Sequence, residues 1–103
     1  MNKDLYVCLM GRDRSKTAAN LFGGDYAGVL DTAEKKLTAE QISGADKIYV
    51  MNSYIKDQIA ERFPKESKGK KVVNMNVSHP GQYMDDELVN ALNLGRYGVE
   101  STY

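Results

Sequence analysis

The stretch LYVCLMGRDRSKTAANLF, from Leu5 to Phe22, joins an apolar run, a short polar loop and an amphipathic segment. The run LYVCLM (5–10) is rich in strand-forming residues and ends at Gly11. Residues 14–24 place small and apolar side chains on one helical face and end in a glycine pair suited to a helix C-terminus. This order of strand, loop and helix is typical of the first half of a βαβ unit.

The same alternation continues to the end of the chain. Apolar runs at 26–30, 47–51 and 71–77 predict further strands, and residues 37–45, 52–63 and 84–95 have the spacing of amphipathic helices. Short apolar runs bounded by helices are typical of a parallel sheet buried on both faces. We therefore expect an α/β fold, with a small open parallel sheet of about four strands flanked by helices.

Local signals set the expected helix ends. Thr38 with Gln41 matches a capping box, and Asn52 or Ser53 is expected to cap the next helix, which Pro64 stops. We expect residues 64–71 to be a polar, basic loop, and residues 95–103 to be a loosely held tail whose two tyrosines could dock.

Composition limits the classes of function. The length of 103 residues is that of a single domain, which we assign to residues 1–103. Lys plus Arg and Asp plus Glu both number 14, so the formal net charge of zero argues against a nucleic-acid partner. With one cysteine and one histidine, we expect no disulfide, no metal site and no cofactor. No membrane-spanning or secretory segment is recognised, and we expect a reducing cytoplasm.

The single cysteine stands where an anion site is expected. Cys8 lies near the end of the first predicted strand, and ligands of open α/β sheets bind beyond the carboxyl ends of strands. The loop Leu9 to Asp13 then presents backbone N–H groups at a helix N-terminus, which favours anions and stabilises a thiolate. Cys8 is therefore expected to act as a nucleophile.

Neighbouring residues fit a phosphate ligand. The guanidinium of Arg14 suits two phosphate oxygens, the hydroxyl of Ser15 can bond the sulfur, and Gly11 allows a tight turn. The pattern Cys8-x5-Arg14-Ser15 is the signature of cysteine-dependent phosphatases. The alternative interpretation is a buried strand cysteine that serves as a small apolar residue, with Arg14 on a solvated helix start.

These motifs resemble the low-molecular-weight protein tyrosine phosphatase family, and most of all a compact group of predicted phosphatases with that fold. The resemblance covers LYVCLMGRDRSKTAANLF (5–22), GADKIYVMNSYIKDQIAERFP (44–64) and YMDDELV (83–89), about half the chain, in the family's order. It implies a phosphatase of phosphotyrosine or another aryl phosphate, in which Cys8 attacks phosphorus and forms a thiophosphate. It also implies a phosphorylated protein or small aryl phosphate as partner, with phosphate or another oxyanion bound by Leu9, Met10, Gly11, Arg12, Asp13 and Arg14.

The resemblance is weakest at the general acid. The family has Asn where this chain has Gly11, commonly a neutral residue where it has Asp13, and an aspartate close to where it has His79. Asp13 is expected to pair with Arg12 or to cap the helix. Three interpretations of the acid stay open: His79 donates the proton, Asp85 (or its neighbour Asp86) donates it, or no strong acid exists.

Two tyrosines are candidates to line the pocket mouth. Tyr83 resembles family positions that stack on the substrate ring, and Tyr54 follows the third predicted strand. A half-buried structural role is the alternative for each.

Other functions remain open at this point. A phosphocarrier resembling the IIB domains of sugar phosphotransferase systems also has a first-strand cysteine, although such loops typically lack the arginine found here as Arg14. A non-catalytic phosphate- or phosphotyrosine-binding module would explain the missing aspartate. Arsenate reduction in its common form needs further cysteines, which this chain lacks.

Overall fold

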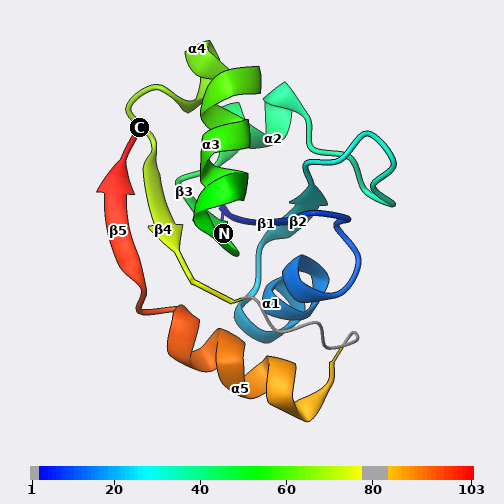
Figure 1. Cartoon of the computed structure of the whole chain (residues 1–103). Coiled ribbons are helices and arrows are strands. Elements are labelled where there is room, and N and C mark those ends of the chain that lie inside the picture. The colour runs from blue at the N-terminus through cyan, green and yellow to red at the C-terminus, as the bar shows by residue number, and fades with distance from the viewer. Residues whose placement is uncertain (1–2, 78–83) are drawn as a thin grey trace.

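The protein forms a mainly parallel sheet flanked by helices, in a computed structural model that describes residues 3–77 and 84–103 (Figure 1). Within these residues the sheet has five strands in the order β2-β1-β3-β4-β5. The strands are β1 (Asp4–Cys8), β2 (Asp25–Gly28), β3 (Lys47–Val50), β4 (Lys71–Asn74) and β5 (Val99–Thr102). The helices are α1 (Arg14–Phe22), α2 (Ala39–Gly44), α3 (Ser53–Arg62), α4 (Pro64–Ser67) and α5 (Asp86–Gly95).

The strand order places the end of β1 at a switch point of the sheet. Strand β1 pairs in parallel with β2 on one side and with β3 on the other, and β3 pairs in parallel with β4. After β1 the chain forms β2 on one side of β1, and then crosses to the other side, where it forms β3, β4 and β5. Crevices open at the carboxyl ends of the strands at such switch points, and Cys8 is the last residue of β1.

The expected α/β fold is confirmed, and the helix caps are those that the sequence predicts. The Thr38 hydroxyl accepts a hydrogen bond from the N–H of Gln41, and the Gln41 side chain accepts one from the N–H of Thr38, which completes the capping box of α2. The Asn52 side chain accepts from the N–H of Ile55 and caps α3.

Two expectations near the C-terminus were wrong. Residues 64–67 form the short helix α4, because Pro64 occupies its first turn, where a missing N–H costs nothing. The tail is not loosely held: β5 pairs antiparallel with β4, and the Tyr103 hydroxyl donates to the carbonyl of Lys56 at 2.9 Å. The sequence of β5, VEST, has no apolar run, so it gives no strand signal. In the structure its one apolar residue, Val99, is 77% exposed, as is typical of an edge strand.

The core lies on both faces of the sheet. Helices α1 and α5 pack together on one side, and α3 packs with β3, β4 and α4 on the other (Figure 1). The fully buried side chains that fill these layers include Tyr6, Ile48, Ile55, Ile59, Leu88 and Leu92. In the described ranges, no helix has the length and apolar character needed to cross a bilayer.

Candidate active site

The Cys8 sulfur is buried between the 9–13 loop and the start of α1. Only 3% of Cys8 is exposed, and its Sγ lies 3.1 Å from the hydroxyl oxygen of the fully buried Ser15. The N–H of Gly11 donates to the same sulfur at 3.2 Å. A backbone N–H, a hydroxyl and the N-terminus of α1 thus surround one sulfur atom, and all three stabilise negative charge.

Gly11 has a conformation and a packing environment that only glycine satisfies. Its φ is +62°, and a Cβ atom there would lie 2.7 Å from the backbone nitrogen of Gly28. A side chain would therefore strain the backbone and collide with β2. The tight turn expected at this position is present.

Arg14 links the start of α1 to the segment that follows β4. Its Nη1 donates to the carbonyl oxygen of Val77 at 2.8 Å. A guanidinium carries five N–H donors in a planar fork, so this bond to Val77 uses one of them and leaves others that suit two oxygens of an anion.

The acidic side chain beside Arg14 is directed toward Arg12. Asp13 Oδ2 lies 3.3 Å from Arg12 Nε, and the Asp13 side chain makes no capping bond to α1. Of the two expectations for Asp13, pairing with Arg12 is therefore the one observed. The pairing offsets part of the negative charge that Asp13 brings to the loop.

Thr17 is a buried polar residue that the sequence did not indicate. Its hydroxyl donates to the carbonyl of Asp13 at 2.7 Å and accepts the N–H of Met84 at 2.9 Å. Thr17 therefore ties the first turn of α1 to the residue that precedes the N-cap of α5. Nothing local marks this role, because Met84 is 67 residues away in the chain.

Of the candidate acids and aromatic residues, the structure describes Asp85, Asp86 and Tyr54. His79 and Tyr83 lie outside the described residues. Asp85 Oδ1 accepts from the N–H of Glu87 at 3.2 Å and caps α5, where Asp86 occupies the first turn. Tyr54 is in the first turn of α3 and is 52% exposed, at the edge of the sheet where β3 ends. The structure thus brings Cys8, Gly11 and Ser15 together, and it gives Asp85 a capping role.

A separate hollow lies at the amino-terminal ends of the strands, opposite the end that carries Cys8. It has a volume of about 490 Å³ and is lined by residues at the amino ends of β1 and β2, including Leu5 and Asp25. Burial opposes ionisation of Asp25, but hydrogen bonds from Lys35, Gln41 and the N–H of Tyr26 outweigh it and lower the pKa of the carboxyl. This hollow is remote from Cys8 and is not part of the candidate active site.

Solved structures share this architecture over nearly the whole chain. A YwlE arginine phosphatase from Geobacillus stearothermophilus superposes with a TM-score of 0.59 at 23% identity, covering 88% of each chain. A protein tyrosine phosphatase from Entamoeba histolytica gives 0.66 at 16% identity, covering 92% of each chain. The low-molecular-weight protein tyrosine phosphatase from T. tengcongensis gives 0.56 at 19% identity, covering 91% of this chain and 97% of the other.

The chain has the fold of the low-molecular-weight tyrosine phosphatases. The resemblance drawn from the sequence is thereby confirmed at the level of the fold. No protein-family model and no curated protein sequence matches the chain. A further structure with this fold is a cysteine mutant of YwlE arginine phosphatase that carries a phosphorylated active-site serine, with a TM-score of 0.60 at 19% identity.

Proposed function

We propose that the protein is a cysteine-dependent phosphatase that hydrolyses phosphate monoesters through a thiophosphate on Cys8. The observation that carries this proposal is the surroundings of the sulfur, where the hydroxyl of Ser15 and the N–H of Gly11 converge at the N-terminus of α1. A structural cysteine needs no such polar shell, because a thiol buried as an apolar residue is inert.

The reaction follows from these groups in two steps. The thiolate attacks phosphorus, so that a sulfur–phosphorus bond forms while the bond from phosphorus to the leaving oxygen breaks. Water then attacks the thiophosphate, inorganic phosphate leaves, and Cys8 returns as the thiolate. The Ser15 hydroxyl donates to the departing sulfur, and the loop N–H groups with Arg14 hold the three equatorial oxygens.

We propose His79 as the general acid, with Asp85 as the alternative. The His79 proposal rests on its position before the YMDD segment and on the ability of imidazolium to donate a proton near neutral pH. It is supported by two described residues that flank residues 78–83: Val77 accepts from Arg14, and Met84 donates to Thr17. The capping bond of Asp85 to Glu87 makes the alternative weaker.

Leaving-group dependence tests the acid. We expect His79→Ala to lose most of its rate on an alkyl-substituted phenyl phosphate, whose leaving group is poor, and much less on a nitrophenyl phosphate. Asp85→Asn tests the alternative: a selective loss on the poor leaving group in that variant, and not in His79→Ala, would assign the acid to Asp85. Equal losses on both substrates would contradict a proton-donating role for His79.

The substrate class that we propose is phosphotyrosine or a similar aryl phosphate, with Tyr54 and Tyr83 lining the pocket mouth. Phosphoarginine is a second candidate, because two of the structural neighbours described above are arginine phosphatases with TM-scores close to those of the tyrosine phosphatases. A thiolate nucleophile must stay reduced, which fits a cytoplasmic protein.

Turnover of an aryl phosphate across pH, by wild type and Cys8→Ser, tests the proposed function. We expect catalytic release of phosphate by wild type and a loss of about a thousandfold or more in the variant. A wild-type protein that binds phosphate without turnover would support a binding module instead. A stable phosphocysteine formed from a phosphohistidine donor would support a phosphocarrier.

A further inference from the structure

The segment from Gly28 to Leu37, which we call the brace, lies directly against the 9–13 loop. Three consecutive carbonyl groups around the loop accept hydrogen bonds from three N–H groups of the brace. The bonds run from Val29 N to Cys8 O, from Leu30 N to Leu9 O and from Glu34 N to Met10 O, at 3.0, 3.0 and 2.9 Å. The carbonyls of Cys8, Leu9 and Met10 are therefore all bonded to one other segment of the chain.

These three bonds fix the direction of three N–H donors. In a planar trans peptide the N–H points away from the carbonyl of the same unit, and no cis peptide occurs in the described ranges. With the carbonyls of Cys8, Leu9 and Met10 directed at the brace, the N–H groups of the next residues point to the opposite side. The N–H of Gly11 obeys this geometry, since it donates to the Cys8 sulfur.

The brace also approaches the loop too closely for side chains. A Cβ on Gly28 would lie 2.4 Å from the backbone nitrogen of Gly11, and a Cβ on Gly11 would lie 2.8 Å from the carbonyl oxygen of Lys35. The two backbones are in direct contact, so a displacement of the brace is transmitted to the loop.

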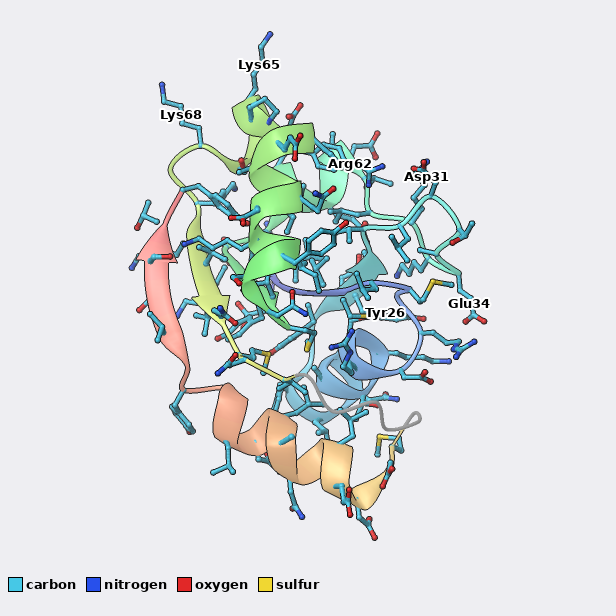
Figure 2. All side chains as sticks on the ribbon, viewed as in Figure 1. Tyr26, Asp31, Glu34, Arg62, Lys65 and Lys68 are labelled. Atoms are coloured by element: carbon cyan, nitrogen blue, oxygen red, sulfur yellow. The ribbon has the colours of Figure 1, made fainter. Side chains whose placement is uncertain are left out.

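A side chain from the far end of α3 holds the start of the brace. Arg62 donates through Nη1 to the carbonyl of Val29 and through Nη2 to Asp31 Oδ1, the latter at 2.8 Å. Lys36 Nζ lies 3.3 Å from the same Asp31 oxygen. Figure 2 shows Arg62 and Asp31 meeting between α3 and the loop after β2, whereas Lys65 and Lys68 extend away from the brace.

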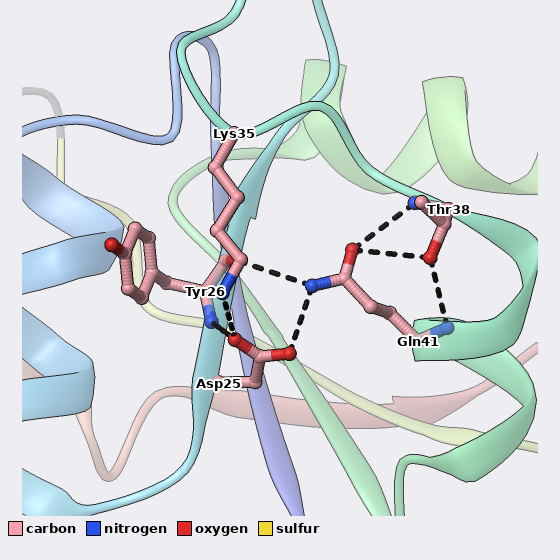
Figure 3. Close-up of polar contacts among 5 residues, drawn as sticks. All are labelled: Asp25, Tyr26, Lys35, Thr38 and Gln41. Carbon is pink, nitrogen blue, oxygen red and sulfur yellow. Dashed lines mark hydrogen bonds and ion pairs between the residues drawn. The ribbon is translucent and has the colours of Figure 1, made fainter.

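A second side-chain network holds the end of the brace. Lys35 Nζ donates to Asp25 Oδ1 at 2.5 Å, and Gln41 Nε2 donates to Asp25 Oδ2 at 2.9 Å (Figure 3). Gln41 also completes the capping box of α2 with Thr38. The brace is thus attached at one end to α3 and at the other to β2 and α2.

We infer that Arg62 is a positioning residue for the active site, acting through the brace to orient the N–H donors of the 9–13 loop toward the phosphoryl oxygens. This inference rests on the proposed phosphatase function. Because Val29 both accepts from Arg62 and donates to the carbonyl of Cys8, the path from guanidinium to loop passes through a single residue.

The test compares wild type, Arg62→Ala, Arg62→Lys and the control Lys65→Ala, which removes an exposed positive charge from the neighbouring helix. We measure kcat and KM for a nitrophenyl phosphate, the inhibition constant of inorganic phosphate, and amide hydrogen exchange at Val29, Leu30 and Glu34, all well below the melting temperature. For Arg62→Ala we expect kcat/KM to fall about three- to tenfold, phosphate inhibition to weaken by a similar factor, and exchange at these amides to speed up.

Arg62→Lys keeps the charge and one donor group, so we expect it to recover part of the lost activity, while Lys65→Ala matches wild type. If Arg62→Ala leaves kcat/KM and phosphate inhibition unchanged, or alters them only in proportion to lost stability, the inference is wrong. An inactive wild type would contradict the proposed phosphatase function.

Hydrogen exchange tests the role of Arg62 separately from activity. If the amides of Val29, Leu30 and Glu34 exchange at the same rate in Arg62→Ala as in wild type, Arg62 does not hold the brace and the inference is wrong.

Discussion

At the scale of single residues, the described contacts of the Cys8 sulfur come from residues within eight positions of the chain. Cys8, Gly11 and Ser15 meet because a strand end, a turn and a helix start follow one another directly. That these three residues lie together could be predicted from the sequence, because a strand end, a turn and a helix start bring such positions to one place. The partners of Thr17 and Arg14 lie more than sixty residues away, and no local pattern indicates such contacts.

Gly11 gives a prediction at this scale. Gly11→Ala is expected to destabilise the fold by at least about 1–2 kcal/mol, because its positive φ is unfavourable for alanine and the Cβ meets Gly28. Activity should fall even in the folded fraction, since the N–H of Gly11 faces the sulfur. Thermal unfolding and kcat measured at low temperature check both effects.

The matched control is Gly69→Ala. Gly69 also has a positive φ, +80°, but a Cβ there meets no atom within 4 Å. We expect the same conformational cost with no loss of kcat. Equal kcat values for the two variants would contradict the role given to the loop backbone.

At the scale of elements, the loops after β1 and β4 are joined through α1. Arg14 bonds the carbonyl of Val77, and Thr17 bonds the N–H of Met84. Most of the strands and helices could be predicted, because each has its own apolar pattern or cap. The exceptions are α4 and the edge strand β5, where the sequence predicts a loop and a loosely held tail. The brace could not, since its hydrogen bonds are made by backbone groups that carry no sequence signal.

Thr17→Val removes both hydroxyl contacts while keeping the shape of the side chain. We expect the free energy of unfolding to fall by about 1–3 kcal/mol, because the N–H of Met84 loses its acceptor. We also expect a larger loss of kcat on a poor leaving group than on a good one, because Met84 adjoins the segment that contains His79.

Thr17→Ser keeps the hydroxyl and should recover most of this loss. Thr102→Val on the exposed edge strand β5 is the control, for which neither stability nor leaving-group dependence should change. If Thr17→Val lowers kcat equally on both substrates, the link to proton donation is wrong.

At the scale of the whole molecule, the C-terminal strand closes one edge of the sheet. The hydroxyl of Tyr103, whose pKa burial raises above its usual value, donates to the carbonyl of Lys56 in α3. Tyr103→Phe is therefore expected to cost about 0.5–1.5 kcal/mol in urea unfolding. Tyr97→Phe is the control, because Tyr97 is 85% exposed, and equal effects of the two changes would contradict docking of the C-terminus.

The network around Asp25 gives the fold a dependence on acid pH. Its folded-state pKa lies below the ordinary value of 3.8, so its stabilising contribution is present above that value and is lost as pH falls through the folded pKa. We expect wild type to be more stable than Asp25→Asn at neutral pH, and this difference to vanish in strong acid.

A double-mutant cycle with Lys35→Gln isolates the main contact. Removal of Lys35 should reduce the effect of Asp25→Asn, because Lys35 donates to the same carboxyl group. Unfolding free energies measured between neutral pH and about pH 3 give the comparison. A difference that grows as the solution becomes more acidic would contradict the lowered pKa.

The central claim is a covalent phosphate on Cys8 during turnover, and rapid-quench mass spectrometry with a nitrophenyl phosphate measures it most directly. When dephosphorylation is the slower step, we predict a burst of nitrophenolate close to one equivalent of enzyme. We also predict a phosphorylated peptide that contains Cys8 and that disappears as inorganic phosphate is released. Steady turnover with no phosphate on Cys8 at any time, or turnover that persists in Cys8→Ser, would contradict the account.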